Sequence, residues 1–263
     1  MVMNEVVEIL NETAATVVLP RFQRLTDVDV TEKSPGELVT AVDREAEALI
    51  SGRLRTLLDV PIVGEEAASA DPGLLAAVAT EPTAWLVDPL DGTANFVAGR
   101  PDYAIMVALL RDGRAVASWI LQPTTGTLYQ AELGSGTYRN GSRVRRSPAP
   151  EATSQLRGVV LTGFLDEETK ARIAAAGSAF NDLGPGTKAA GIDYPRVVDG
   201  YQDFTRYQRT LPWDHAPGAL LLTEAGGTVL RLDGAPYQPG DGRTGLLIAS
   251  DPDCWATVRD VIG

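Results

Sequence analysis

The sequence has little of two residue types on which common enzyme mechanisms depend. Cys254 is the only cysteine and His215 the only histidine among 263 residues. A single cysteine excludes an internal disulfide, and we expect its thiol to be buried in a C-terminal helix. One histidine gives a Ser-His-Asp hydrolase a single possible base, and most zinc sites need more nitrogen or sulfur ligands. Carboxylates are therefore the main side chains left for catalysis or metal binding, and they select hard cations such as magnesium.

Long apolar runs and an excess of positive charge are also missing. No run approaches the roughly 18 apolar residues that a membrane span needs, and the first five residues lack the basic start of a signal peptide. The 35 acidic residues outnumber the 23 basic ones, and the net charge of −12 opposes binding to nucleic acids or anionic membranes. We therefore expect a cytoplasmic protein with no nucleic-acid and no membrane partner.

The composition that is present is typical of a folded globular protein, with 44% hydrophobic and 22% charged residues. Residues 1–146 combine helical patterns with β-prone runs joined by tight turns, which predicts an α+β half with an antiparallel sheet. Residues 147–263 alternate strands and helices, which predicts an α/β half. We expect the two halves to pack tightly as one unit, with their boundary in the Pro-, Ser- and Ala-rich segment 147–153.

Apolar spacing predicts the individual elements. The first helix covers residues 4 to about 25 and bends or ends at Pro20, and the second begins at Leu38. The polar segment 26–35 between them predicts a loop or a weak hairpin. Asp112-Gly113 is the strongest hairpin signal, between strands 103–111 and 114–122. Later strands are expected at 158–161, 202–207, 228–231 and 246–249, and helices at about 166–180, 189–198, 216–225 and from Pro252.

The strongest chemical signal is a pair of aspartates at the end of an apolar strand, residues 84–87. Asp88 ends the strand, the following proline turns the chain so that the carbonyl of Leu90 faces inward, and Asp91 supplies a second carboxylate. Gly92 and Thr93 then offer backbone N–H groups and a hydroxyl to a phosphate. Asp-Pro or Asp-Gly alone is more typical of an ordinary turn. Together, these residues predict a site for a metal ion and a phosphate.

Other carboxylates near predicted element ends have simple structural explanations. Asp43 near the start of the second helix complements the helix dipole. Glu65 and Glu66 follow a short strand, and a solvated acidic loop is an equal alternative to a binding site. Asp214 precedes an apolar helix, so that capping is the simplest role, and His215 is expected to pack or hydrogen-bond beside it.

Two segments resemble the signatures of the inositol monophosphatase family, whose members are magnesium-dependent, lithium-sensitive phosphomonoesterases. The first segment is Trp85-x-x-Asp88-Pro89-x-Asp91-Gly92-Thr93-x-Asn95-Phe96. The second is Trp213-Asp214-His215-Ala216-Pro217-Gly218, continued by Glu224-Ala225-Gly226-Gly227. The resemblance implies a layered α/β fold, the five-layer αβαβα sandwich of the sugar-phosphatase type. It also implies that segment 26–35 borders the active site.

The resemblance further implies the roles of individual residues. Glu65 would help to activate the attacking water, and Asp43 would hydrogen-bond Thr93 so that its hydroxyl is oriented toward that water. Two to three Mg²⁺ ions per subunit would be held by Glu65, Asp88, the Leu90 carbonyl, Asp91 and Asp214. The implied substrate contacts are Gly92, Thr93, Lys188, Ala190, Tyr207 and Asp214.

The implied activity is hydrolysis of a small phosphate monoester by metal-activated water, in a homodimer. Tyr207 occupies the position at which inositol phosphatases carry a glutamate that binds sugar hydroxyls, which disfavours inositol phosphate as the dedicated substrate. Lys188, Arg206 and Arg209 would suit a second anionic group, although surface arginines without a substrate role are an equal alternative for the last two. Histidinol phosphate, fructose 1,6-bisphosphate and adenosine 3′,5′-bisphosphate remain alternative substrates.

A non-catalytic function is the alternative of another class. Some members of the family act as partners of the transcription machinery, and this chain resembles them too. The intact set of acidic residues favours an enzyme. A calcium-binding structural module is disfavoured, because the expected ligands come from distant segments and not from one EF-hand loop.

Overall fold

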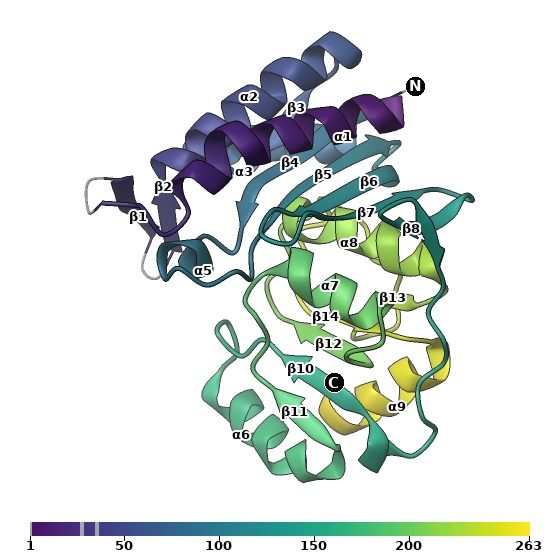
Figure 1. Cartoon of the computed structure of the whole chain (residues 1–263). Helices are drawn as coiled ribbons and strands as arrows, with labels where there is room; N and C mark the ends of the chain where they lie inside the picture. Colours follow the sequence, from purple (N-terminus) through teal and green to yellow (C-terminus); the bar gives the residue numbers. More distant parts are fainter. Residues whose placement is uncertain (1, 27–28, 35–36) are drawn as a thin grey trace.

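Seven strands from the first part of the chain form one large sheet in the computed structural model, which describes residues 2–26, 29–34 and 37–263 (Figure 1). The first two strands are parallel and the other neighbours are antiparallel. Asp112 and Gly113 both have positive φ in the turn between the third and fourth strands, as the hairpin signal predicted. In sheet order, the strands are β3 (Ile62–Gly64), β4 (Thr83–Asp91), β5 (Ala104–Arg111), β6 (Arg114–Gln122), β7 (Thr127–Glu132), β8 (Gly136–Arg139) and β9 (Ser142–Val144).

The first two long helices, α1 (Val2–Thr13) and α2 (Ala41–Leu57), lie together on one face of this sheet (Figure 1). Their apolar stripes are fully buried against Trp85 and Trp119 of the sheet. The chain leaves α1 through a π-helical turn, Ala14–Val18, and a 3₁₀ turn that contains Pro20, Leu19–Arg21. The predicted helix end at this proline is therefore confirmed.

The opposite face of the seven-stranded sheet is covered by α7 (Ala190–Val198) and α8 (Pro212–Ala225). These helices also pack on a second sheet, which α6 (Glu167–Ala176) and α9 (Pro252–Ile262) cover from its far side. The layer order is therefore αβαβα, as predicted (Figure 1). In sheet order, the strands of the second sheet are β11 (Asp182–Gly184), β10 (Arg157–Val160), β12 (Phe204–Tyr207), β14 (Leu246–Ala249) and β13 (Thr228–Arg231).

Shorter elements complete the described residues. A hairpin is formed by β1 (Val30–Ser34) and β2 (Glu37–Thr40). Residues 27, 28 and 35 of the predicted loop or weak hairpin lie outside the described residues. The remaining short helices are α3 (Glu65–Ala70), a 3₁₀ turn at Pro72–Leu75, α4 (Ala76–Thr80), α5 (Thr93–Val97), and 3₁₀ turns at Thr153–Gln155 and Gly177–Ala179. Within the described ranges, no helix has the length and apolar composition needed to cross a membrane.

Three sequence predictions need correction. The second helix begins at Ala41 and not at Leu38, because the preceding residues pair with β1. Strand β11 was not predicted, and its three residues carry little apolar signal. Asp214 does not cap a helix, because α8 already begins at Pro212. Cys254 is buried as expected, and burial raises the pKa of its thiol to about 11. The division of the chain at residue 146 stays a prediction.

Candidate active site

A buried carboxylate connects the second helix to the aspartate motif. Asp43 is fully buried, and its Oδ1 accepts a hydrogen bond from the Thr93 hydroxyl at 2.8 Å. Its Oδ2 accepts from the backbone N–H of Thr40 at 2.8 Å and from the Thr40 hydroxyl at 2.5 Å. Thr40 is the N-cap of α2, so that Asp43 completes a capping box. The structural role proposed for Asp43 and the contact implied by the resemblance are thus both present.

The Thr93 hydroxyl has a second possible acceptor. Its oxygen lies 3.0 Å from the carbonyl oxygen of Leu90, the carbonyl expected to ligate a metal. A hydroxyl has one proton, so it donates to Asp43 or to Leu90 at any moment. When the proton points toward Asp43, a lone pair of the hydroxyl oxygen can accept a hydrogen bond from a neighbouring group.

Gly92 brings the aspartate motif into close contact with the segment that carries Lys188 and Ala190. Its φ is +86°, and a Cβ at this position would lie 2.9 Å from both the Ala189 side chain and the Asp102 carbonyl. Only glycine fits such a close approach. Nearby, the amide of Asn95 donates to the carbonyl oxygens of Asp102 at 2.7 Å and Thr187 at 2.8 Å. Ala190 is buried and Lys188 is exposed with a φ of +64°.

Four carboxylates from separate elements influence one another electrostatically at this point. Asp88 and Asp91 lie at the end of β4, Glu65 begins α3, and Asp214 lies in the first turn of α8. Burial raises the pKa of Asp88 well above its ordinary value, and the charges of Glu65, Asp91 and Asp214 raise it further. The pKa of Asp214 is raised by burial and by Glu65 and Asp91.

Asp91 is held by the backbone of α7. Its Oδ2 accepts a hydrogen bond from the N–H of Gly191 at 2.6 Å. Burial nevertheless raises the pKa of its carboxyl to about 7, with smaller contributions from the charges of Asp193 and Glu65. Such an arrangement favours either a proton or a bound cation over free negative charge.

Lys33 of β1 is a site residue that the sequence did not single out. Its ammonium group lies 3.0 Å from Oε1 of Glu65 and forms a second ion pair with Glu66. Burial alone would lower the pKa of Lys33, but the charges of Glu65 and Glu66 outweigh burial and raise it. The resemblance pointed only to the surrounding segment 26–35. No local pattern distinguishes this lysine from others on the surface.

The carboxylates fit a magnesium site in their chemistry but are engaged with other groups. Across the three described ranges, no three or more His, Cys, Asp or Glu side chains already form a group that could hold a metal ion. Glu65 contacts Lys33, Asp91 contacts Gly191, and Asp88 Oδ1 accepts from the N–H of Leu90 at 3.1 Å. Buried carboxylate oxygens that repel one another are the donor set that a hard divalent cation requires. The metal-ligand assignment stays a prediction.

Tyr207 lies in an aromatic cluster. Its ring stacks on Tyr194 with centroids 5.6 Å apart and meets the edge of His215 at 4.6 Å. The buried hydroxyl of Tyr207 has no hydrogen-bond partner among the described residues. His215 lies 3.1 Å from the Tyr194 hydroxyl and 3.2 Å from the carbonyl oxygen of Arg209, so its expected packing role is confirmed.

The two arginines near Tyr207 point to different places. Arg206 shares the strand face of Phe204, which packs in the core between β12 and the outer helices α6 and α9, whereas Tyr207 faces the middle layer. Arg206 is also only 3% exposed, so that the expected surface role is wrong, and a substrate contact stays a prediction that its strand face disfavours. The guanidinium of Arg209 lies 4.4 Å from the centroid of the Phe164 ring, and its charge partly offsets the raised pKa of Asp214.

Comparison with known proteins gives one family across nearly the whole chain. The model of the inositol monophosphatase family matches residues 2–259. A chloroplastic phosphatase of Arabidopsis thaliana, IMPL1, is 30% identical over 249 residues, which are 90% of this chain and 64% of that protein. The Nus factor SuhB of Escherichia coli strain K12 is 30% identical over 246 residues, 91% of this chain and 87% of that protein.

Solved structures agree with the layered fold. The extragenic suppressor protein suhB of Bartonella henselae superposes with a TM-score of 0.83 at 24% identity, covering 99% of this chain and 98% of that one. An IMPase of Thermotoga maritima gives a TM-score of 0.81 at 25% identity, covering 97% and 94%.

Proposed function

The chain belongs to the inositol monophosphatase family, and we propose that it hydrolyses a small phosphate monoester with magnesium as its cofactor. The observation that carries this proposal is the group of mutually repelling carboxylates, Glu65, Asp88, Asp91 and Asp214, beside the Thr93–Asp43 hydrogen bond. The family is generally metal-dependent, and these carboxylates suit a hard divalent cation.

We propose that two to three Mg²⁺ ions bind to Glu65, Asp88, the Leu90 carbonyl, Asp91 and Asp214. When bound, the metal would disperse charge on the phosphoryl oxygens and provide a hydroxide-like nucleophile near neutral pH. The backbone N–H groups of Gly92 and Thr93 would bind the phosphate. Lys33 would then exchange its ion pair with Glu65 for contacts elsewhere, because Glu65 is needed as a ligand.

The proton of the attacking water has a path through residues of the chain. Asp43 accepts a hydrogen bond from the Thr93 hydroxyl, which leaves a lone pair of that oxygen to accept a hydrogen bond from the water and orient it. Glu65 would share the role of base. His215 is left out of this scheme, because both of its ring nitrogens are engaged, one with the Tyr194 hydroxyl and the other with the carbonyl oxygen of Arg209.

The site residues disfavour one substrate, inositol phosphate, but do not select a single ester among the others. Tyr207 presents an aromatic ring where an inositol hydroxyl would need a charged acceptor, and Ala190 offers no polar side chain. Exposed Lys188 suits a second anionic group. Histidinol phosphate, fructose 1,6-bisphosphate and adenosine 3′,5′-bisphosphate are therefore tested beside inositol 1-phosphate.

The test is phosphate release from these four esters with Mg²⁺, with Asp88→Asn as the inactive control. We expect one ester to be preferred and the variant to lose at least about a hundredfold in rate, because it weakens the metal site. Metal-free Asp88→Asn should melt at a higher temperature than the wild type, since a buried repelling charge is removed. A folded wild-type protein that hydrolyses none of the four esters would contradict the substrate range. Wild-type rates in the variant would contradict the metal scheme.

A second candidate function is binding to the transcription machinery, which the 30% identity with proteins named Nus factor SuhB favours. Cells that lack this chain would be complemented with the wild type or with Asp88→Asn. Complementation by the inactive variant would favour the binding function, and its failure would favour the enzyme.

A homodimer and a cytoplasmic location are further proposals that follow from the resemblance and the charge. Light scattering after size-exclusion chromatography tests the first, and cell fractionation the second.

A further inference from the structure

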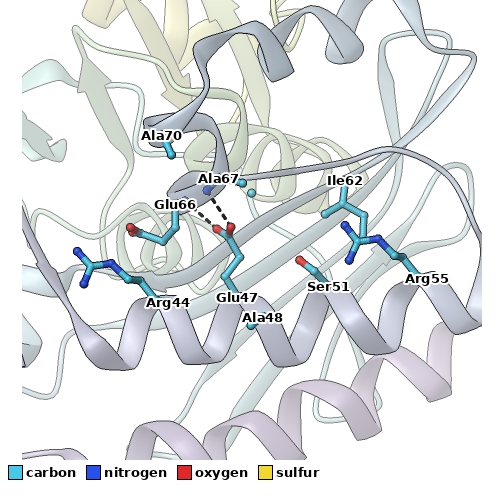
Figure 2. Close-up of a pocket in the computed structure, with 10 residues that line it drawn as sticks. Arg44, Glu47, Ala48, Ser51, Arg55, Ile62, Glu66, Ala67 and Ala70 are labelled. Carbon is cyan, nitrogen blue, oxygen red and sulfur yellow. Dashed lines mark hydrogen bonds between the residues drawn. The ribbon is translucent and has the colours of Figure 1, made fainter.

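Glu47 on α2 directs its carboxylate at the backbone of another helix (Figure 2). Its Oε2 accepts the N–H of Glu66 at 2.7 Å, and its Oε1 accepts the N–H of Ala67 at 2.9 Å. Glu66 and Ala67 are the second and third residues of α3. These are the two N–H groups that an N-cap side chain normally accepts from. Glu47 therefore caps α3 from outside that helix.

The local N-cap residue of α3 cannot perform this task. It is Gly64, which has ordinary extended backbone angles, φ −93° and ψ 155°, and no side chain to accept a hydrogen bond. A Cβ at Gly64 would lie 2.4 Å from Cδ of Glu47 and 2.5 and 2.7 Å from its carboxylate oxygens. The backbone does not require glycine here. The space is taken by the carboxylate of Glu47.

Apolar packing between α2 and α3 is incomplete beside Glu47. A cavity of about 500 Å³ lies beside Glu47 and is lined also by Arg44, Ser51, Arg55 and Ile62 (Figure 2). Its presence means that apolar packing does not fill the space between these elements. On its other side α3 is anchored by Ala68, which is buried with Val63 and Val78. The helix should therefore stay folded without Glu47 but lose the contact that holds its backbone N–H groups, while the ion pairs of Lys33 with the Glu65 and Glu66 side chains remain.

The first residue of α3 is Glu65, the proposed metal ligand. We propose that Glu47 is a positioning residue, which holds the first turn of α3 so that Glu65 presents its carboxylate to the divalent cation. The inference rests on the proposed metal-dependent function. It predicts a loss of metal affinity when the cap is removed, because partners that orient ligands typically contribute about ten- to a hundredfold.

The first experiment measures Mn²⁺ affinity by calorimetry, with Mn²⁺ as a stand-in for Mg²⁺ on carboxylate ligands. Glu47→Ala should weaken Mn²⁺ binding about tenfold or more. Gly64→Ser alone should also weaken it, because its side chain displaces the carboxylate. Gly64→Ser in the Glu47→Ala background should instead restore affinity, because serine then fits and caps α3 locally. Gly64→Ser should thus lower Mn²⁺ affinity in the wild type and raise it in Glu47→Ala. A general loss of stability would lower the affinity in both backgrounds.

Glu45→Gln is the matched control, together with Glu47→Gln. Glu45 lies two residues away on α2 and pairs with Arg21 at the surface, so its substitution should leave Mn²⁺ affinity unchanged. Glu47→Gln should weaken it, because the amide presents only one acceptor to two N–H groups. Amide hydrogen exchange at Glu66 and Ala67 should accelerate in Glu47→Ala and slow again in the double variant.

Different results would contradict the proposed metal-dependent function and the proposed role of Glu47. A wild-type protein that binds no Mn²⁺ would defeat the proposed function. Full Mn²⁺ affinity in folded Glu47→Ala, or unchanged exchange at Glu66 and Ala67, would overturn the role of Glu47 and leave the metal site intact.

Discussion

Two regions of the molecule near the candidate site differ in how their polar atoms are paired. Around the aspartate motif, Asp43, Asp91 and Thr93 all have hydrogen-bond partners within 2.8 Å. In β12 and α7, by contrast, some buried polar atoms have no hydrogen-bond partner within the described part of the chain: the hydroxyl of Tyr207, Oδ2 of Asp193 and two nitrogens of Arg206. Asp43, Asp91 and Thr93 are thus held by hydrogen bonds, whereas these atoms of the neighbouring region are not.

This difference has an energetic meaning. A buried polar atom without a partner costs about 1–3 kcal/mol, whereas a paired one is roughly neutral or slightly stabilising. Substitutions around the motif should therefore reduce activity, and substitutions in the second region should change stability more than catalysis. The three predictions below test this contrast from the largest expected effect to the smallest.

Thr93→Val should reduce kcat by about a hundredfold, because it removes the hydroxyl that Asp43 orients and keeps the shape of the side chain. Steady-state phosphate release at saturating magnesium measures the effect. Thr16→Val, the same change on the exposed surface, is the control. Equal kcat values for the two variants would remove Thr93 from the mechanism.

Asp193→Asn should change how stability depends on pH. Burial raises the pKa of Asp193 to about 6, against hydrogen bonds from Thr187 and the charge of Arg196, with Asp102 adding to the increase. The folded state therefore binds this proton more tightly than the unfolded state. The associated stability is complete below about pH 4 and is lost as pH rises through about 6.

Over this range Asp193→Asn should lose roughly 2–3 kcal/mol less stability than the wild type in metal-free protein, because the other buried carboxyl groups titrate in both proteins. Urea unfolding with a chelator present, at steps between pH 4 and 7.5, compares the two proteins. Parallel curves for wild type and variant would show that Asp193 does not carry the raised pKa.

Arg206→Met should leave KM unchanged and raise the free energy of unfolding by about 1 kcal/mol, because a buried guanidinium with unpaired nitrogens is replaced by an apolar side chain. Urea unfolding and the KM for the preferred ester measure the two effects. An increase in KM would show that Arg206 reaches the substrate, contrary to its position on the outer face of β12.

Much of the fold followed from short-range patterns. The Asp112-Gly113 turn, the helix end near Pro20 and the strand that carries Asp88 were all predicted, because each depends on the residues immediately around it. The resemblance added the layer order. Errors occurred where tertiary pairing overrides local preference, as at Leu38, which is drawn into β2 by pairing with β1.

The sequence by itself determined the family, the layered fold and the acidic residues of the candidate site, because these lie in contiguous motifs. Only the tertiary structure decided that Lys33 pairs with Glu65, that Arg206 faces away from Tyr207 and that Glu47 caps α3. Each of these facts depends on how separate elements pack or on which face of a strand a side chain occupies. Contacts between residues that are distant in the chain leave no pattern in a single sequence. A motif can be identified from the sequence because its residues are neighbours in the chain.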